Sequence, residues 1–218
     1  AQAETHETHL NVFETFEPKV PKHGVRSTVT FCANLHPSIQ LSVLDQSEPK
    51  RATILDSMNL WINIAYDELI QAMKRVDIVV INDGEVTMLA DSQNLVEAAK
   101  KVQSMASIPT LIIKKGEHGV LALHGDDIIA LPAYPTDVVV DPTGCGDTFA
   151  GSLAACLSNG VGQIGTNELR QALIHATVSA SFTLENFGTR GIESMDSDSY
   201  RERLDTYCSI SGTSVDAS

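Results

Sequence analysis

Residues 141–149 read Asp-Pro-Thr-Gly-Cys-Gly-Asp-Thr-Phe, so three helix-disfavouring residues stand between two acids. A helix-compatible run, 148–157, follows at once. A glycine turn that opens a helix directs several free backbone N–H groups at one point, and the helix dipole adds partial positive charge there. The stretch therefore predicts a pocket for a phosphate or a developing oxyanion.

Asp147 lies at the mouth of this predicted pocket. A carboxylate in that position could take the proton from a hydroxyl group that attacks phosphorus. The alternative is an ordinary strand-to-helix turn with a capping acid, because short motifs also occur by chance. The acid, the glycines and the helix-compatible run follow one another at the spacing that such a pocket needs, which favours the phosphate-binding interpretation.

The same stretch resembles the second signature of the PfkB (ribokinase-like) carbohydrate kinases, usually Asp-x-Thr-Gly-Ala-Gly-Asp-x-Phe. Cys145 replaces the usual alanine here, a small change in a pocket built from backbone. The resemblance implies that the N–H groups of Gly144, Cys145 and Gly146 cradle the transferred phosphoryl group and that Asp147 is the base. It also implies ATP as co-substrate, together with Mg²⁺.

The composition limits the classes of partner. The 218 residues include 28 acidic and 15 basic side chains, which gives a net charge of −13 and argues against nucleic acid or an anionic membrane surface. No apolar run approaches the roughly 20 residues of a membrane span. The four cysteines form no Cys-x-x-Cys pair, which fits reduced thiols in a cytoplasmic protein without a zinc site.

Alternating short apolar runs and amphipathic segments predict an α/β fold. The expected strands are 28–32, 51–55, 78–81, 110–113, 119–123, 128–131 and 138–140, with a further strand-like alternation over 10–16. The expected helices are 38–45, 66–74, 85–89, 94–105, 147–158, 167–182 and 197–207. Strands that alternate with helices indicate a parallel sheet covered on both faces, and the last, shorter strands indicate an antiparallel edge.

With the resemblance, this pattern predicts a single ribokinase-like domain over 1–218, a three-layer α/β/α sandwich with a mainly parallel sheet. Residues 1–27 are expected to be the remnant of a mostly missing lid, and the polar tail 209–218 to fray. The resemblance covers about residues 10–205, the later two-thirds of a typical family member, and no Gly-Gly substrate signature is found. A fragment or an incomplete gene model is therefore expected.

A second motif follows the predicted strand 78–81, where the chain reads Asn82-Asp83-Gly84-Glu85. It is similar to the family's Asn-x-x-Glu motif, which implies that Glu85 organises Mg²⁺, often through water, and that Asn82 lies near the nucleotide phosphates. A hard cation that keeps its waters needs only a few nearby carboxylates. The alternative is a helix N-cap with an acid in the first turn.

The strand 110–113 leads into Lys114-Lys115-Gly116-Glu117-His118-Gly119. Gly116 and Gly119 match a family turn that lies against the nucleotide, and glycine permits a close approach of the backbone. A plain hairpin turn is the alternative. Lys114 or Lys115 could neutralise phosphate charge, and Lys115 is included among the nucleotide-binding candidates.

Three further assignments come from the resemblance alone. His175, Asn186 and Gly188 are expected to wall the nucleotide pocket. Asp141 and Thr143 belong to an element that holds a monovalent cation in some relatives, which leaves K⁺ open. The segment Asp56-Ser57-Met58-Asn59 resembles an Asp-x-Asn element near the phosphate path, although Leu60-Trp61 replaces the arginine that often follows.

Two classes of function remain open at this point. One is an ATP-dependent sugar kinase, or its catalytic portion, with a nucleoside as the alternative acceptor and a homodimer expected for the full-length form. The other is a nucleotide-binding remnant that lacks an acceptor site. Missing strands would also expose a sheet edge, so the isolated chain is expected to aggregate or to need a partner.

Overall fold

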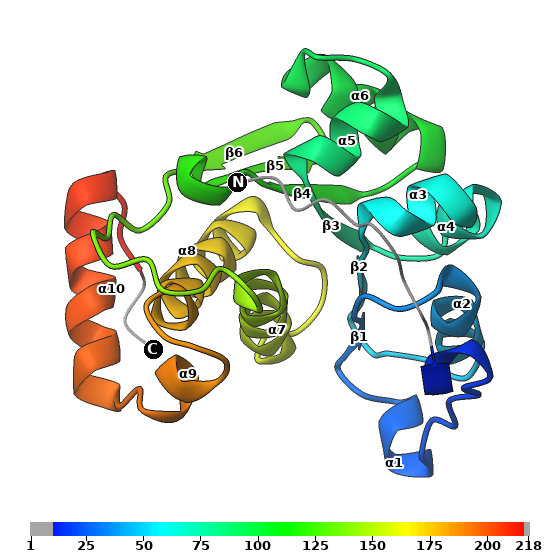
Figure 1. Ribbon diagram of the computed structural model, residues 1–218, viewed down its shortest axis with the longest axis horizontal. Coiled ribbons are helices and arrows are strands. Elements are labelled where there is room, and N and C mark those ends of the chain that lie inside the picture. The colour runs from blue at the N-terminus through cyan, green and yellow to red at the C-terminus, as the bar shows by residue number, and fades with distance from the viewer. Residues whose placement is uncertain (1–10, 216–218) are drawn as a thin grey trace.

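The computed structural model describes residues 11–215 (Figure 1). Six strands form one sheet: β1 Val29–Cys32, β2 Ala52–Asp56, β3 Ile78–Asn82, β4 Thr110–Lys114, β5 Val120–His124 and β6 Asp127–Leu131. Their order across the sheet is their order along the chain. Strands β1 to β4 are parallel, whereas β5 is antiparallel to β4 and to β6.

Helices cover both faces of this sheet (Figure 1). One face carries α2 Pro37–Asp45, α3 Asn59–Ile64, α4 Tyr66–Met73, α5 Asp83–Ala90 and α6 Leu95–Ala106. The other face carries α7 Cys145–Ser158, α8 Thr166–Leu184 and α10 Ser197–Ser211, and the short α9 Arg190–Glu193 follows α8. The remaining elements are short: η1 Asn11–Glu14, α1 Lys22–Val25 and η2 Gly116–His118. The predicted ribokinase-like α/β sandwich with an antiparallel edge is confirmed.

The strands are apolar on both sides because both sides are buried. In β3, Val79 and Ile81 pack into the core under α2 to α6, whereas Ile78 and Val80 pack into the core under α7 and α8. All four side chains are at most 1% exposed. This explains the continuous β-branched run in the sequence, which is typical of parallel strands.

Arg51, which precedes β2, links the sheet to the end of α7 and the start of α8. Its side chain is 2% exposed and forms an ion pair with Glu168 of α8 at 2.5 Å. The same guanidinium donates hydrogen bonds to the carbonyl oxygens of Leu157 and Gly162. Gly160 lies against this group, and a side chain there would overlap both Arg51 and Glu168.

Two predicted strands are wrong. Residues 11–14 form η1 instead, and Val12, Phe13 and Phe16 are largely exposed, so no sheet receives this segment; Leu10 lies outside the described residues. Residues 138–140 form no strand either. The N–H groups of Val140 and Asp141 both donate to the carbonyl oxygen of Leu184, so this segment is bound to the end of α8.

The C-terminal helix is longer than predicted. It continues to Ser211 and ends at Gly212, which has a φ of +64°. The Ser211 hydroxyl donates to the Tyr207 carbonyl, and Gln171 binds the Ser214 carbonyl at 2.9 Å. Residues 209–215 are therefore held against the fold instead of fraying, and 216–218 lie outside the described residues. The lid assignment of residues 1–27 stays a prediction.

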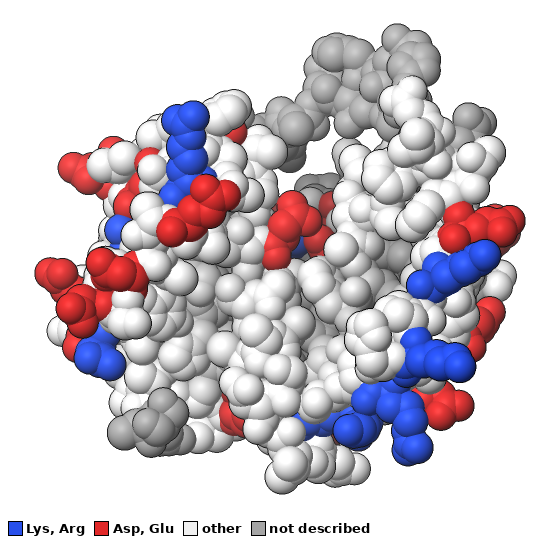
Figure 2. Space-filling model, turned by 90° about the horizontal axis from the view of Figure 1, so that it is seen from below, with Lys and Arg blue, Asp and Glu red and all other residues white. Residues whose placement is uncertain are grey.

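Charge is unevenly distributed on the surface. Figure 2 shows that acidic side chains, with a basic side chain beside them, line a hollow near the middle of one face. Within residues 11–215, no helix has both the length and the apolar character that crossing a bilayer requires.

Candidate active site

The glycine turn and the start of α7 have the geometry that the sequence predicts. Gly144 is the N-cap residue and has a φ of +85°, a left-handed conformation that glycine adopts without strain. The Asp141 carboxylate accepts the Thr143 N–H at 2.9 Å, and the Cys145 N–H donates to the Pro142 carbonyl at 3.2 Å. These two bonds shape the turn from within.

The bonds inside the turn also determine which amides are available to a ligand. The Cys145 N–H is occupied by Pro142, although it was expected in the anion pocket. Among residues 11–215, the N–H groups of Gly144, Gly146 and Asp147 have no hydrogen-bond partner. Two of the three predicted amides are therefore available to an anion, together with that of Asp147, and their contact with a phosphoryl group stays a prediction.

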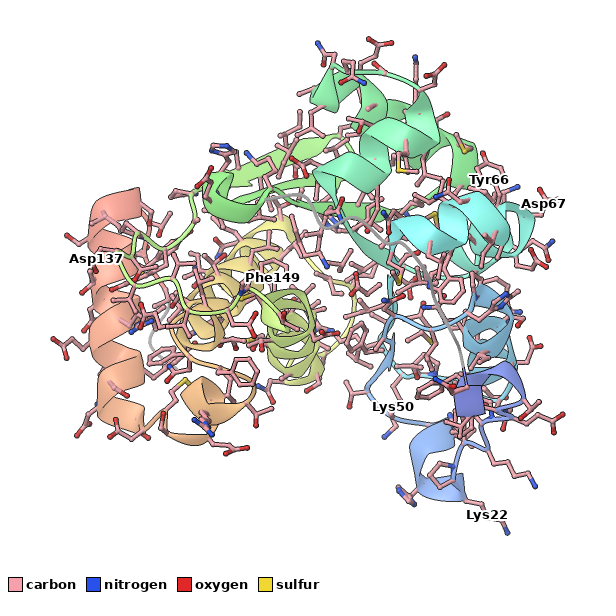
Figure 3. All side chains as sticks on the ribbon, viewed as in Figure 1. Lys22, Lys50, Tyr66, Asp67, Asp137 and Phe149 are labelled. Carbon is pink, nitrogen blue, oxygen red and sulfur yellow. The ribbon has the colours of Figure 1, made fainter. Side chains whose placement is uncertain are left out.

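Asp147 lies in that first turn and is exposed. No hydrogen bond or ion pair holds its carboxylate among the described residues. Two residues on, Phe149 is buried between α7 and the sheet (Figure 3), and Thr148 bonds the Thr183 hydroxyl of α8 at 2.8 Å. Packing thus fixes the helix while the Asp147 carboxylate stays accessible to a reactant.

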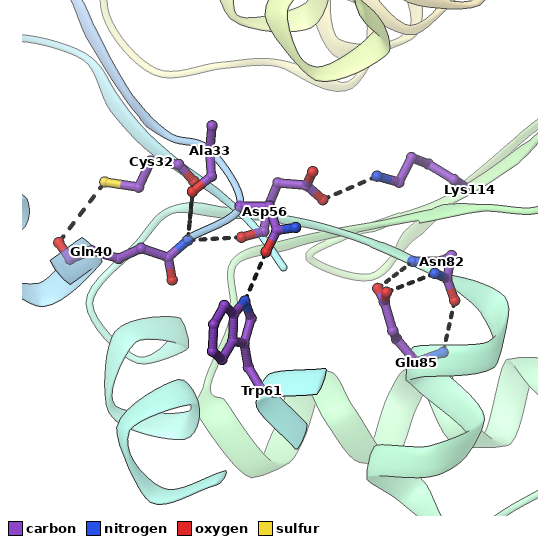
Figure 4. Close-up of polar contacts among 9 residues, drawn as sticks. Cys32, Ala33, Gln40, Asp56, Trp61, Asn82, Glu85 and Lys114 are labelled. Atoms are coloured by element: carbon purple, nitrogen blue, oxygen red, sulfur yellow. Dashed lines mark hydrogen bonds and ion pairs between the residues drawn. The ribbon is translucent and has the colours of Figure 1, made fainter. Parts of the chain in front are cut away.

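Asn82 and Glu85 form a complete capping box at the start of α5 (Figure 4). The Asn82 side chain accepts the Glu85 N–H at 2.8 Å, and the Glu85 carboxylate accepts the Asn82 N–H at 2.9 Å and its side-chain amide at 2.6 Å. Glu85 is 4% exposed, and burial raises its pKa to about 7. The capping alternative is therefore realised, and any role for Glu85 at Mg²⁺ has to coexist with these bonds.

Asp56 and Lys114 bring two further charges to the same edge of the sheet. Each is the last residue of its strand, and the Lys114 ammonium lies 3.0 Å from the Asp56 carboxylate (Figure 4). Burial raises the pKa of Asp56, while Lys114 acts in the opposite direction. Asp147 also raises this pKa through its charge, which indicates that α7 begins near the Asp56 carboxylate.

Gln40 of α2 joins the ends of β1 and β2 beside this pair, a contact that the sequence did not reveal. Its side-chain amide donates to the carbonyl oxygens of Ala33 at 2.9 Å and of Asp56 at 2.8 Å (Figure 4). The side chain is 2% exposed. The one sequence feature that could have indicated this contact is a glutamine among the apolar residues of the predicted helix 38–45.

The turn after β4 is built for close packing. Gly116 and Gly119 both have positive φ, and Lys115 and Gly119 are joined by a backbone hydrogen bond of 2.8 Å. A side chain at Gly119 would overlap the backbone at Leu131 and Pro132. The glycine at 119 is therefore required by the neighbouring strand end, and a contact of Gly116 or Lys115 with nucleotide stays a prediction.

The residues expected to wall the nucleotide pocket lie on or after α8. The His175 ring accepts or donates a hydrogen bond of 2.7 Å with the Tyr200 hydroxyl, and burial lowers its pKa. The Asn186 amide donates to the Phe182 carbonyl at 3.2 Å. Gly188 is exposed and has a φ of +64°. His175 thus has a structural partner, and the binding roles of all three stay predictions.

The cation sites can be tested against the donor groups present. No group of three or more His, Cys, Asp or Glu side chains in residues 11–215 is arranged to hold a metal. Mg²⁺ retains several waters and takes one or two carboxylates plus substrate phosphates, so Glu85 fits it through water, whereas the Asp56 carboxylate is paired with Lys114. The hydrogen bond from the Thr143 N–H lowers the pKa of Asp141, which is partly exposed. This geometry fits both a site for a monovalent cation and a plain turn, so the K⁺ assignment stays a prediction.

Comparison with known proteins gives the family. A sequence profile of the pfkB family of carbohydrate kinases matches residues 45–195. The chain belongs to the pfkB family. The matched range contains the Asn82–Glu85 box, the turn after β4 and the glycine turn of α7, so the family assignment covers all three motifs.

Individual relatives agree with this assignment. The cytidine kinase of Thermococcus kodakarensis is 31% identical over 150 residues, 66% of this pfkB chain and 52% of the relative. The Methanocaldococcus jannaschii nucleoside kinase has a TM-score of 0.68 at 18% identity, over 90% of this chain and 60% of that one. A Vibrio cholerae fructokinase has a TM-score of 0.70 at 16% identity, over 90% and 64%. The chain thus spans about half of the curated relative's length.

Proposed function

We propose that this protein transfers the γ-phosphoryl group of ATP to a hydroxyl group of a sugar or a nucleoside. The observation that carries the proposal is the exposed Asp147 carboxylate beside the unpartnered amides of Gly144, Gly146 and Asp147 at the start of α7. A helix N-terminus with free N–H groups attracts phosphate, and a carboxylate beside it can accept the acceptor's proton. Membership of the pfkB family supports the same reaction class.

In the proposed step, the acceptor oxygen forms a bond to the γ-phosphorus while the bond to the bridging oxygen of ATP breaks. ADP leaves with that electron pair, and the hydroxyl proton moves to Asp147. The amides of Gly146 and Asp147 bind the oxygens of the transferred group, where negative charge must be stabilised. Glu85 is the residue that would hold Mg²⁺ through water, and the ion would neutralise phosphate charge when bound.

A nucleoside acceptor is the second candidate. The relative with 31% identity is a cytidine kinase, and one structural neighbour is a nucleoside kinase, whereas another is a fructokinase. A nucleoside presents a sugar hydroxyl to the same base, so the chemistry at Asp147 does not change. A panel that includes both sugars and nucleosides separates these candidates.

The test is Asp147→Asn, because the amide keeps the size of the side chain but cannot accept the proton. We expect phosphoryl transfer to fall by roughly 10²–10⁴-fold, while calorimetry finds Mg·ATP binding within about threefold of wild type. The matched control is Asp67→Asn, an exposed acid in the first turn of α4 on the other face of the sheet (Figure 3). It should leave both quantities unchanged.

Two outcomes would contradict the proposal. Near-normal turnover of Asp147→Asn would remove the base, and a wild-type protein that binds no Mg·ATP would remove the kinase site. Binding of Mg·ATP without turnover on any sugar or nucleoside would instead support the nucleotide-binding remnant.

A further inference from the structure

Lys114 brings a basic side chain to the candidate site, beside Asp56 and Gly146. Its neighbours are acids: it forms an ion pair with Asp56, and its charge also acts on buried Glu85. Asp147 lies close enough to influence Asp56. An acidic site of this kind would repel a polyphosphate unless a cation faced the ligand.

The position of the Lys114 ammonium relative to the glycine turn is unusual. A Cβ atom added to Gly146 would lie 3.1 Å from the Lys114 Nζ atom. The ammonium therefore lies close against the Gly146 backbone, where a Cβ atom would crowd it. It is next to the Gly146 amide, which has no partner, at the positive end of the α7 dipole.

The ammonium also remains able to bind a ligand. Asp56 accepts one of its three N–H groups, and no other hydrogen-bond partner is found in the described part of the chain. The Lys114 side chain is 21% exposed, whereas that of Asp56 is 6% exposed. The buried Asp56 carboxylate thus holds the ammonium in position, and the two remaining N–H groups are available to a ligand.

We propose that Lys114 contacts the terminal phosphoryl group of ATP, and that Asp56 is the positioning residue that holds the ammonium beside Gly146. This inference rests on the proposed function, since it names a further group at the same site. It favours Lys114 over Lys115, the lysine included among the nucleotide-binding candidates from the sequence. It also gives Gly146 a second role, because a Cβ atom there would lie in tight contact with the ammonium.

The experiment compares Mg·ATP with Mg·ADP by calorimetry, because only ATP carries the terminal phosphoryl group. We expect Lys114→Met to weaken Mg·ATP binding about tenfold or more, the usual effect of losing a charge-assisted hydrogen bond. Mg·ADP binding should stay within about threefold of wild type. Lys114→Arg, which keeps the positive charge, should recover part of the affinity for ATP.

Removal of Lys114 alone leaves the buried Asp56 carboxylate unpaired, so a double variant is needed. Asp56→Asn with Lys114→Met leaves a neutral pair, and we expect the same selective loss of ATP affinity. Lys50→Met is the matched control, since Lys50 is exposed (Figure 3). It lies before the amino end of β2, whereas Lys114 lies at the carboxyl end of β4. This control should bind both nucleotides like the wild type, and thermal melting verifies that each variant folds.

Three results would overturn this inference while the proposed function stands. They are wild-type affinity for ATP in Lys114→Met, equal weakening of ATP and ADP, and recovery of ATP binding in the double variant. A wild-type protein without affinity for Mg·ATP would overturn the proposed function itself. If Lys114→Met does not fold, the double variant and Lys114→Arg decide the question by the same comparison.

Discussion

At the scale of single residues, burial separates the acids around the glycine turn. Glu85 and Asp56 are 4% exposed, whereas Asp147 is open to solvent. Desolvation disfavours a charged carboxylate, which is why the pKa of each buried acid is raised. The buried acids are therefore suited to holding other groups in place, and the exposed acid to exchanging a proton with a reactant.

The raised pKa of Glu85 has a measurable effect on stability. Between its ordinary pKa of 4.5 and its folded pKa of about 7, the folded state binds more protons at Glu85 than the unfolded chain does. The free energy of unfolding therefore falls as pH rises through this window. We expect wild type to lose roughly 2 kcal/mol relative to Glu85→Gln between these pH values, measured by urea unfolding.

Glu97→Gln is the control for this pH dependence. Glu97 is exposed on α6, and its ion pair with Lys101 lowers its pKa, so its contribution disappears only as pH falls below 4.5. Asp56 is present in all three proteins and cancels in the comparison. Equal slopes for wild type and Glu85→Gln would show that Glu85 is charged in the folded protein throughout the window.

At the scale of elements, two ion pairs allow a direct comparison of buried and exposed contacts. Arg51 joins β2 to α8 with a side chain that is 2% exposed, whereas Arg75 pairs with Asp45 at 2.6 Å with side chains that are 45% and 65% exposed. Arg51→Met leaves the Leu157 carbonyl and the Glu168 carboxylate without their partner.

We expect Arg51→Met to lower the free energy of unfolding by about 2 kcal/mol, because it removes the hydrogen bonds that the buried guanidinium donates to the Leu157 and Gly162 carbonyls, as well as its pairing with Glu168. Arg75→Met should change it by less than about 0.5 kcal/mol, since exposed pairs contribute little. Urea unfolding followed by circular dichroism measures both variants. Similar losses in the two would mean that the contacts of Arg51 do not join the elements in solution.

Elements with a strong local pattern could be predicted from the sequence. The run 78–81 is β-branched and buried on both faces, so its assignment as a strand is confirmed in β3. The run 138–140 is also entirely β-branched, but its last residue bonds to Leu184 of α8, a contact that a local pattern cannot reveal. Helix α3 was missed because it is short and its N-cap, Met58, gives no capping signal.

The candidate site was predictable to the extent that it is made of consecutive residues. The glycine turn and the capping box each lie within one short motif, and their geometry follows from the backbone. The pairing of Lys114 with Asp56 joins residues from β4 and β2, with β3 between them. Lys115 and not Lys114 was included among the nucleotide-binding candidates from the sequence, because sequence spacing does not show where α7 begins in space.

At the scale of the whole molecule, β1 is an edge strand that pairs only with β2 within the described residues. An unpaired strand edge is a template for association with another chain. We expect the isolated protein to self-associate as its concentration rises, measured by light scattering after gel filtration. Val29→Lys should reduce this association, because a charge on the edge disfavours pairing.

The control for the edge variant is Lys50→Met, which changes the charge just before β2 and leaves the residues of β1 unchanged. A monodisperse wild-type monomer at all concentrations would contradict the prediction. Equal association of wild type and Val29→Lys would place the contact elsewhere on the surface.

The agreement between strand order and chain order affects how the protein is made. Each strand finds its neighbour already synthesised as it leaves the ribosome, so the sheet can grow in the direction of translation. The apolar side chains beneath α7 and α8 have no cover until the last third of the chain emerges. Nascent chains that pause before this point carry a bare apolar sheet face, which is the surface that chaperones bind.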